Sequence, residues 1–107
     1  MDEYLTMSDL FKQVSIENLR KNHDDIVENM DSNAILDDLI YWNLLTPDKV
    51  QMYSTICTPF KNWERKARNI WLLNTIFQGT RSDLEVVQIL FDSFNATHQF
   101  DVAKMLT

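Results

Sequence analysis

Apolar residues recur three or four positions apart along most of this chain, which is the spacing that places side chains on one face of an α-helix. A capping residue or a helix breaker follows each such stripe after about 15 residues. The pattern therefore predicts six helices, which cover about 15–30, 32–43, 47–55, 62–77, 82–95 and 100–106.

Residues with strong capping preferences mark the boundaries of these helices. The first helix starts at Ser8 or at Ser15, and we expect a bend or a break near Ser15. Ser32 is the expected N-cap of the second helix, and Thr46 is that of the third. Gly79, the only glycine, is the expected C-cap of the fourth helix.

The composition supports an all-helical fold. Turns and strand boundaries depend on glycine and proline, and the 107 residues include only one Gly and two Pro. Hydrophobic residues make up 45% and charged residues 24%, a balance typical of a globular domain with one modest core. We therefore expect an all-α, antiparallel six-helix bundle over residues 16–107, and 1–15 as an N-terminal extension or the first part of helix one.

Charge and hydropathy argue against several kinds of partner and location. The net charge of -6 disfavours nucleic acid and anionic membranes as partners. The acidic start "MDEYLTMSDLF" lacks the features of a signal peptide, and no apolar run reaches the roughly 20 residues of a membrane span. We therefore expect a cytoplasmic protein. An apolar stripe that continues up to "DVAKMLT" favours a longer protein beyond Thr107, with a small stand-alone protein as the alternative.

No residue pattern predicts catalysis or cofactor binding. His23, Asp24 and Glu28 have a spacing that could face a metal, but a solvated polar face explains them better without a second His nearby. Cys57, the single cysteine, allows no internal disulfide and has no nucleophile signature around it. One glycine cannot form a glycine-rich phosphate loop. We expect no enzymatic activity, no metal and no cofactor.

Charge is segregated along the chain. Five basic residues and one acid lie from Lys61 to Arg81, a net of +4, whereas seven acids and no Lys or Arg lie from Asp24 to Asp48. Such segregation indicates two surfaces that bind oppositely charged partners. Two plain alternatives exist, since a charged run is often only a solvated helix face, and some of these charges could neutralise each other within one molecule.

A helical wheel separates the charges of the fourth helix from its apolar residues. It places Arg65 and Arg68 on an outward face, with Leu72 between them, and Lys66 nearer to the edge of the core. The predicted buried side of this helix consists of Trp63, Ala67, Ile70, Leu73 and Phe77.

The second helix carries an acidic counterpart. Its predicted buried stripe consists of Ile35, Leu36, Leu39 and Ile40. Asp37 and Tyr41 point away from that stripe, Asp38 follows them, and Asp48 lies in the first turn of the third helix. Tyr41 and Trp42 flank these acids and are candidate interface aromatics. One basic and one acidic face on the same molecule predict head-to-tail pairing, which builds rings or filaments.

Four stretches of the chain share their order and spacing with a known family. They are "LRKNHDDIVENM", "ILDDLIYWNLLTPDKVQMY", "ERKARNIWLL" and "FNATHQFDVAKML". Together, from about Ile16 to Leu106, they resemble the first helix, the second and third helices, the fourth helix and the close of a caspase recruitment domain. His98 stands where that family usually has a glycine.

The resemblance implies the Greek-key topology of the death-fold superfamily and a binding module without an active site. Its partner would be another caspase recruitment domain, of the same protein, a caspase or an adaptor, in apoptotic or innate-immune signalling. The implied partner-binding basic face, on the first and fourth helices, consists of Arg20, Lys21, Arg65 and Arg68. The implied acidic face, on the second and third helices, consists of Asp31, Asp37, Asp38 and Asp48.

Other readings share part of these features. A stand-alone decoy would carry the same surfaces, and only the rest of the reading frame would separate it from an initiator-caspase prodomain or an apoptosome-type adaptor. A nucleic-acid binder would use the run from Lys61 to Arg81 and stack Trp63 and Trp71 on bases, which the overall acidity opposes. Death, death effector and pyrin domains share the six-helix fold.

Overall fold

All regular secondary structure in the described part of the chain is α-helical. The computed structural model describes residues 14–56 and 64–107, so Cys57, Trp63 and most of the expected extension at 1–15 lie outside it. The described helices are α2 (Ile16–Lys21), α3 (His23–Asn29), α4 (Ser32–Tyr41), α5 (Pro47–Ile56), α6 (Arg65–Ile76), α7 (Asp83–Ala96) and α8 (Phe100–Lys104). The expected all-α class is confirmed for these residues.

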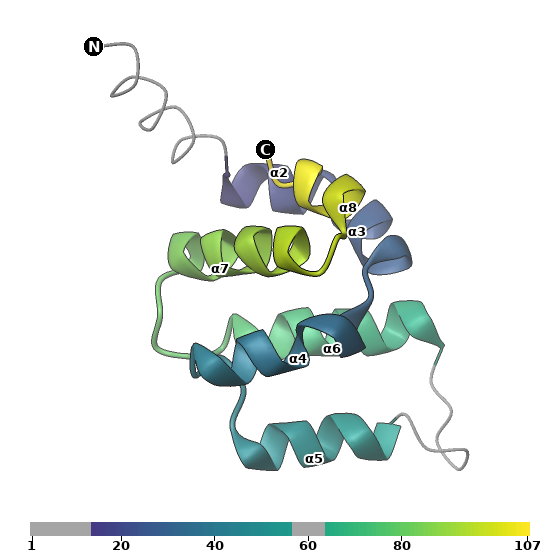
Figure 1. Ribbon diagram of the computed structural model, residues 1–107, viewed down its shortest axis with the longest axis vertical. Helices are drawn as coiled ribbons and strands as arrows, with labels where there is room; N and C mark the ends of the chain where they lie inside the picture. Colours follow the sequence, from purple (N-terminus) through teal and green to yellow (C-terminus); the bar gives the residue numbers. More distant parts are fainter. Residues whose placement is uncertain (1–13, 57–63) are drawn as a thin grey trace.

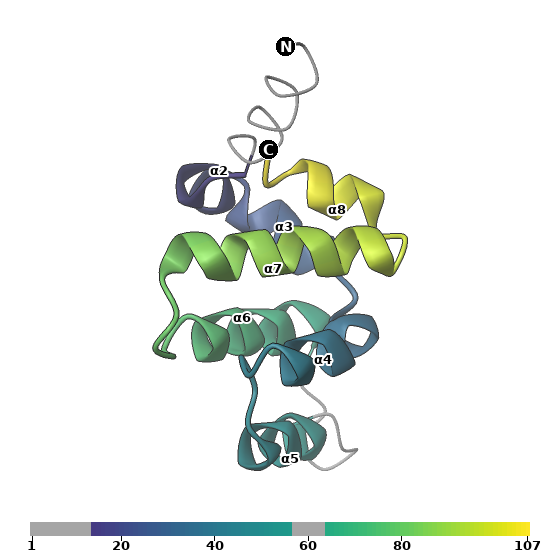
Figure 2. The same cartoon turned by 60° about the vertical axis from the view of Figure 1, so that its left-hand side comes forward.

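The helices are stacked in layers (Figure 1). Helix α5 lies at one end, α4 and α6 lie beside it, α7 follows, and α2, α3 and α8 close the other end; Figure 2 gives the same order from a second direction. Helices α4 and α6 run one way and α5 and α7 run the opposite way. Consecutive helices from α4 to α7 therefore alternate in direction, as in an antiparallel bundle.

One cluster of buried apolar side chains joins these layers. Every helix except α5 contributes to it, while α5 buries Tyr53 and Ile56. Burial of each such side chain contributes roughly 1.5–3 kcal/mol, so this cluster is the main stabilising term of the fold. Its largest fully buried members are Ile26, Met30, Ile35, Leu39, Leu72, Ile76, Leu90, Phe94 and Leu106.

The expected first helix is divided into α2 and α3 by a break at Asn22 that the sequence did not predict. Ser15, where a start or a break was expected, has an extended backbone and precedes α2, whereas the alternative start at Ser8 lies outside the described residues. Ser15 is the N-cap of α2, because its hydroxyl accepts a hydrogen bond from the Asn18 N–H at 3.0 Å. The Asn22 side-chain amide donates to the backbone carbonyl of Met105 at 2.8 Å. This contact joins residues 83 positions apart, so local sequence rules cannot locate the break.

The expected N-cap of α4 was wrong by one residue. The Asp31 carboxylate, rather than the Ser32 hydroxyl, accepts the capping hydrogen bond, from the Ala34 N–H at 3.4 Å. Ser32 is buried, and its hydroxyl is hydrogen-bonded to the hydroxyl of Tyr53 on α5. A residue that could cap its own helix is used instead to hold the neighbouring one.

The expected C-cap at Gly79 was also wrong. A glycine at this cap position normally has a positive φ, and Gly79 does not; α6 ends at Ile76 with Phe77 as its C-cap. In the described chain positive φ occurs instead at Asn43, with 59°, and at His98, with 61°. His98 thus has the left-handed backbone that a glycine adopts without steric cost.

Helix α6 presents a different face to the core from the predicted one. Its buried residues are Asn69, Leu72, Leu73 and Ile76. Leu72, expected between the outward arginines, is fully buried, whereas Ala67, expected in the core, is exposed. Leu73 is buried as predicted, and Ile70 and Phe77 pack partly buried against the core. The buried face is therefore rotated towards Asn69 and Leu72 relative to a wheel oriented on Trp63.

Candidate functional site

Two aromatic side chains stand exposed where α4 ends. Tyr41 is 77% exposed and Trp42 is 44% exposed, and their rings meet edge to face with centroids 5.2 Å apart. Arg81 lies on the other side of Trp42, with its guanidinium carbon 6.0 Å from the ring centroid. Its Nε also donates to the Trp42 carbonyl at 3.1 Å. Arg81 therefore fixes Trp42, and Tyr41 projects beyond it.

Three of the predicted acidic residues share this region. Asp37 is exposed and Asp38 half-buried in the last two turns of α4, and the exposed Asp48 lies in the first turn of α5. The link between these helices brings the start of α5 next to the end of α4 (Figure 1). We call this surface, made of Asp37, Asp38, Asp48, Tyr41 and Trp42, the α4 corner.

Asp31 lies at the opposite end of α4 and has structural contacts. Besides capping α4, it pairs through its backbone with Gln99 of the α7–α8 turn. Its N–H donates to Gln99 Oε1 at 2.7 Å, and its carbonyl accepts from Gln99 Nε2 at 3.1 Å. Asp31 precedes Asp37, the first residue of the α4 corner, by six residues, about 9 Å along the helix axis, and its contacts face the α7–α8 turn instead.

The four predicted basic residues do not form one cluster. Arg20 and Lys21 are exposed at the end of α2, and Arg65 is exposed at the start of α6. Arg20 lines a hollow of about 280 Å³ whose other lining residues include Asn74, in the second half of α6. Arg65 precedes Asn74 by nine residues, about 13 Å along the helix axis. Arg68, expected to be outward, is half-buried.

Other cations of the basic run are paired within the molecule. Lys66 Nζ lies 3.6 Å from Glu28 Oε1 and 4.0 Å from Asp24 Oδ1, both on α3. Arg81 Nη1 likewise lies 3.2 Å from a Glu85 carboxylate oxygen. Lys61 is outside the described residues. The run therefore presents less positive charge to a partner than its sequence suggests.

The contacts of Lys66 also explain the acids of α3. Asp24 and Glu28, considered above as metal ligands beside His23, face this lysine instead. Within residues 14–56 and 64–107, no three His, Cys, Asp or Glu side chains are grouped so that they could hold a metal ion.

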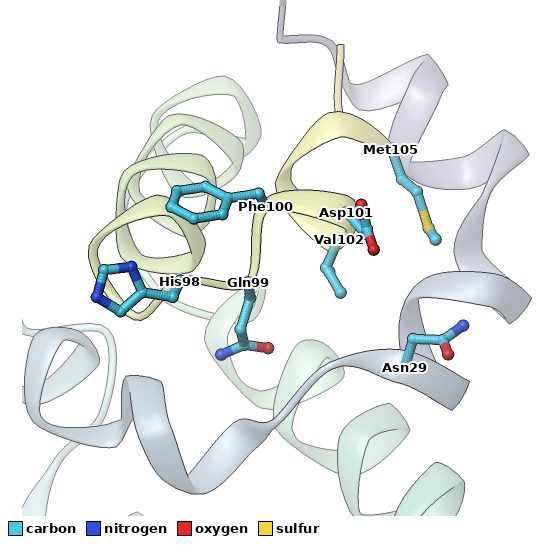
Figure 3. A pocket seen from close by; sticks show the side chains of 7 residues that line it. All are labelled: Asn29, His98, Gln99, Phe100, Asp101, Val102 and Met105. Carbon is cyan, nitrogen blue, oxygen red and sulfur yellow. The ribbon is translucent and has the colours of Figure 1, made fainter.

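A pocket of about 430 Å³ lies between α3 and the start of α8 (Figure 3). Its titratable side chains, His98 and Asp101, point to different sides of the α7–α8 turn, so they form no acid–base pair. Phe100, 58% exposed, stands between them and contacts the imidazole edge to face at 5.6 Å. The complete lining is Asn29, His98, Gln99, Phe100, Asp101, Val102 and Met105.

Comparison with known proteins assigns no family. No protein-family model matches the chain, and searches of the curated proteins and of the solved structures find no match. Among the described helices, none is both long enough and apolar enough to cross a membrane. The candidate surfaces are therefore judged by their own residues.

Sequence reasoning missed two features of these surfaces. It counted Arg81 with the free cations, although that side chain holds Trp42 in place. It also treated Phe100 only as the start of a helix, although more than half of it is exposed. The spacing of Arg81 and Glu85, four residues apart at the start of a helix, could have indicated their ion pair and thus that Arg81 is not a free cation.

Proposed function

We propose that this chain is a homotypic protein–protein interaction domain of the caspase recruitment type. In this proposal, the α4 corner of one domain meets the exposed Arg65 at the start of α6 of another, and the exposed Arg20 and Lys21 add positive charge from their separate position on α2. The contact is head to tail and recruits or oligomerises signalling proteins. Asp31 and Arg68 support the fold of each copy more than the contact, because of their position and burial.

The position of the two charged surfaces carries the proposal. In Figure 1, α4 ends on the left of the molecule, next to the start of α5, whereas α6 begins with Arg65 on the right. Surfaces at opposite ends cannot satisfy each other within one molecule. A second copy can bind each charged surface with its own oppositely charged surface. Every added copy then presents one unbound surface, so the assembly grows as a ring or a filament.

The local structure is also compatible with the proposed family. Counted as the two halves of one broken helix, α2 and α3 bring the described helices to six. His98, the departure from the family's usual glycine, has a φ of 61°, which is a glycine-like backbone conformation. These two points support the caspase recruitment type beside the four ordered sequence stretches.

The contact must act as a set of charges. One exposed ion pair contributes about 0–1 kcal/mol, which is too little to hold two proteins together. Several pairs and the exposed aromatic area of the α4 corner are needed, and the ionic part is screened over about 8 Å at physiological salt. Association is therefore expected to weaken as the salt concentration rises.

Charge reversal at Arg65 tests the proposal. We expect Arg65→Glu to abolish self-association measured by sedimentation velocity at low salt, with an unchanged helical circular dichroism spectrum. Lys104→Glu is the matched control, because it makes the same charge change on an exposed residue of α8. The proposal is wrong if the unmodified chain stays monomeric under these conditions, or if the Arg65 variant assembles as well as the control.

A further inference from the structure

Among the described residues, Arg81 occupies an arginine site built around Trp42. The Arg81 guanidinium lies over the indole ring at 6.0 Å, and its Nη1 contacts the Glu85 carboxylate at 3.2 Å. An aromatic face and a carboxylate together satisfy both properties of a guanidinium, its flat cationic surface and its fork of N–H donors.

A second pair of a carboxylate and an aromatic ring, from Asp37 and Tyr41, lies beside the Trp42 site. Among the described residues, no ion pair is recorded for this carboxylate. Asp37 and Tyr41 are four residues apart on α4, so their side chains leave the helix on one side, one turn apart. Both are exposed, and the edge contact with Trp42 holds the Tyr41 ring. Among the described residues, no cation lies over the Tyr41 ring, whereas the Trp42 ring has Arg81.

We propose that Asp37 and Tyr41 form a binding site for a guanidinium group, and that its occupant is Arg65 of a second copy of this chain. This inference rests on the proposed function and goes further, because it requires an arginine where the head-to-tail contact alone requires only positive charge. It assigns Tyr41 as the residue that sets this specificity.

The other arginines of the chain fit this role less well. Arg81 is engaged by Trp42 and Glu85, and Arg68 is half-buried. Arg20 is exposed, but it lines a hollow whose other lining residues include the acidic Asp83. Arg65 is exposed at the first residue of α6. The positive end of the helix dipole disfavours a cation at this position, and a carboxylate from a partner would stabilise it.

Guanidinium and ammonium groups differ at such a site. A guanidinium stacks on an aromatic face and forms two parallel hydrogen bonds to one carboxylate at the same time. The lysine ammonium is a compact, strongly hydrated charge and cannot do both. A lysine at position 65 would therefore keep the charge of the contact and lose most of what Tyr41 contributes.

The test compares charge-preserving and ring-preserving variants by sedimentation equilibrium. We expect Arg65→Lys and Tyr41→Ala each to raise the dissociation constant about tenfold, and Tyr41→Phe to change it less than about threefold. The Arg65→Lys and Tyr41→Ala double variant should be no weaker than about tenfold, because the two changes remove the same interaction. Since Tyr41 is largely exposed, all variants should unfold at the urea midpoint of the unmodified chain.

Three contradicting results have different meanings. If Arg65→Glu abolishes association while Arg65→Lys and Tyr41→Ala leave the dissociation constant unchanged, the contact is ionic only and the guanidinium site is wrong. If Arg65→Glu itself has no effect, the proposed head-to-tail function fails, and this inference fails with it. Effects of the two single changes that multiply in the double variant would also overturn the assignment, because they would be independent.

Discussion

Asn69 is a polar residue in the centre of the core, and it determines how α6 meets α3. It is fully buried, and its side-chain amide donates to the backbone carbonyls of Val27 at 2.8 Å and of Met30 at 3.0 Å. These carbonyls lie at the end of α3, where a helix leaves acceptors without internal partners. One amide thus satisfies the end of a neighbouring helix and orients its own.

Replacing Asn69 with Ala should destabilise the domain by about 3 kcal/mol, because two buried carbonyls lose their donor and a small cavity forms. Urea unfolding followed by circular dichroism measures this change. Asn29→Ala is the matched control: the Asn29 amide donates to the Asp25 carbonyl at 2.7 Å on an exposed surface, and its loss should change stability by less than about 0.5 kcal/mol. Equal effects of the two variants would contradict the role given to Asn69.

His98 has an energetically unfavourable backbone conformation. At a φ of 61°, a non-glycine residue costs the folded state roughly 1–2 kcal/mol of free energy, which a glycine would not. Because glycine is more flexible in the unfolded chain, its larger entropy loss on folding cancels roughly 0.5–1 kcal/mol of this gain. We therefore expect His98→Gly to stabilise the domain by about 0.5 kcal/mol, seen as a higher urea midpoint with an unchanged slope. His98→Ala keeps the strain and serves as the control; a glycine variant less stable than the alanine variant would refute the expectation.

At the scale of elements, α5 is held differently from the other helices. It lies at one end of the stack and contributes two buried side chains outside the main cluster, Tyr53 and Ile56. The Tyr53 ring lies 6.2 Å from that of Trp71 on α6, and its hydroxyl is hydrogen-bonded to Ser32 of α4. The start of α5 carries Asp48, so this attachment also positions part of the α4 corner.

A double-mutant cycle measures the attachment of α5 to α4. Tyr53→Phe and Ser32→Ala should each destabilise the domain by about 1 kcal/mol, because each removes the hydrogen bond between these two buried hydroxyls. The double variant should lose little more than either single one, giving a coupling of about 1 kcal/mol. Ser54→Ala removes an exposed hydroxyl from the same helix and should be neutral. Additive losses would mean that the two hydroxyls do not depend on each other.

At the scale of the whole molecule, the separation of the charged surfaces makes a prediction that a symmetric dimer does not. Asp37→Ala removes a carboxylate from the acidic surface of one variant and leaves its basic surface intact, whereas Arg65→Glu disables the basic surface and leaves the acidic one intact. Each variant alone should be monomeric. Their mixture should form a 1:1 complex and nothing larger, because one complementary pair of surfaces remains and the ends are blocked.

Sedimentation velocity or light scattering of the mixed variants gives the result directly. Mixing the Arg65→Glu variant with an Asp101→Ala variant is the control, since Asp101 is an exposed acid on α8 outside the α4 corner. That mixture should still contain larger species formed by the Asp101 variant. Growth of the Asp37 and Arg65 mixture beyond the 1:1 complex would rule out a single head-to-tail contact.

Much of the helical structure was predictable because its causes are local. Apolar spacing located the described helices to within a few residues, and the buried positions Leu19, Ile26 and Val27 were expected from it. Helix starts at Ser15 and Thr46 followed from their capping side chains, which bond within three residues. The exposure of Asp37 and Tyr41 was also expected, since Ile35 and Leu39 were correctly predicted to be buried, although Ile40 of the same predicted stripe is 39% exposed.

The sequence by itself determined the helical class, the approximate helix ranges and the segregation of charge, because each depends on residues close together in the chain. Only the tertiary structure decided the orientation of α6, the break at Asn22, the ion pairing of Lys66 with α3 and the contact of Arg81 with Trp42. Each of these depends on a hydrogen bond or ion pair to a residue far away in the chain. Long-range partners decide which polar side chains are buried or neutralised, and therefore which charges remain for a partner protein.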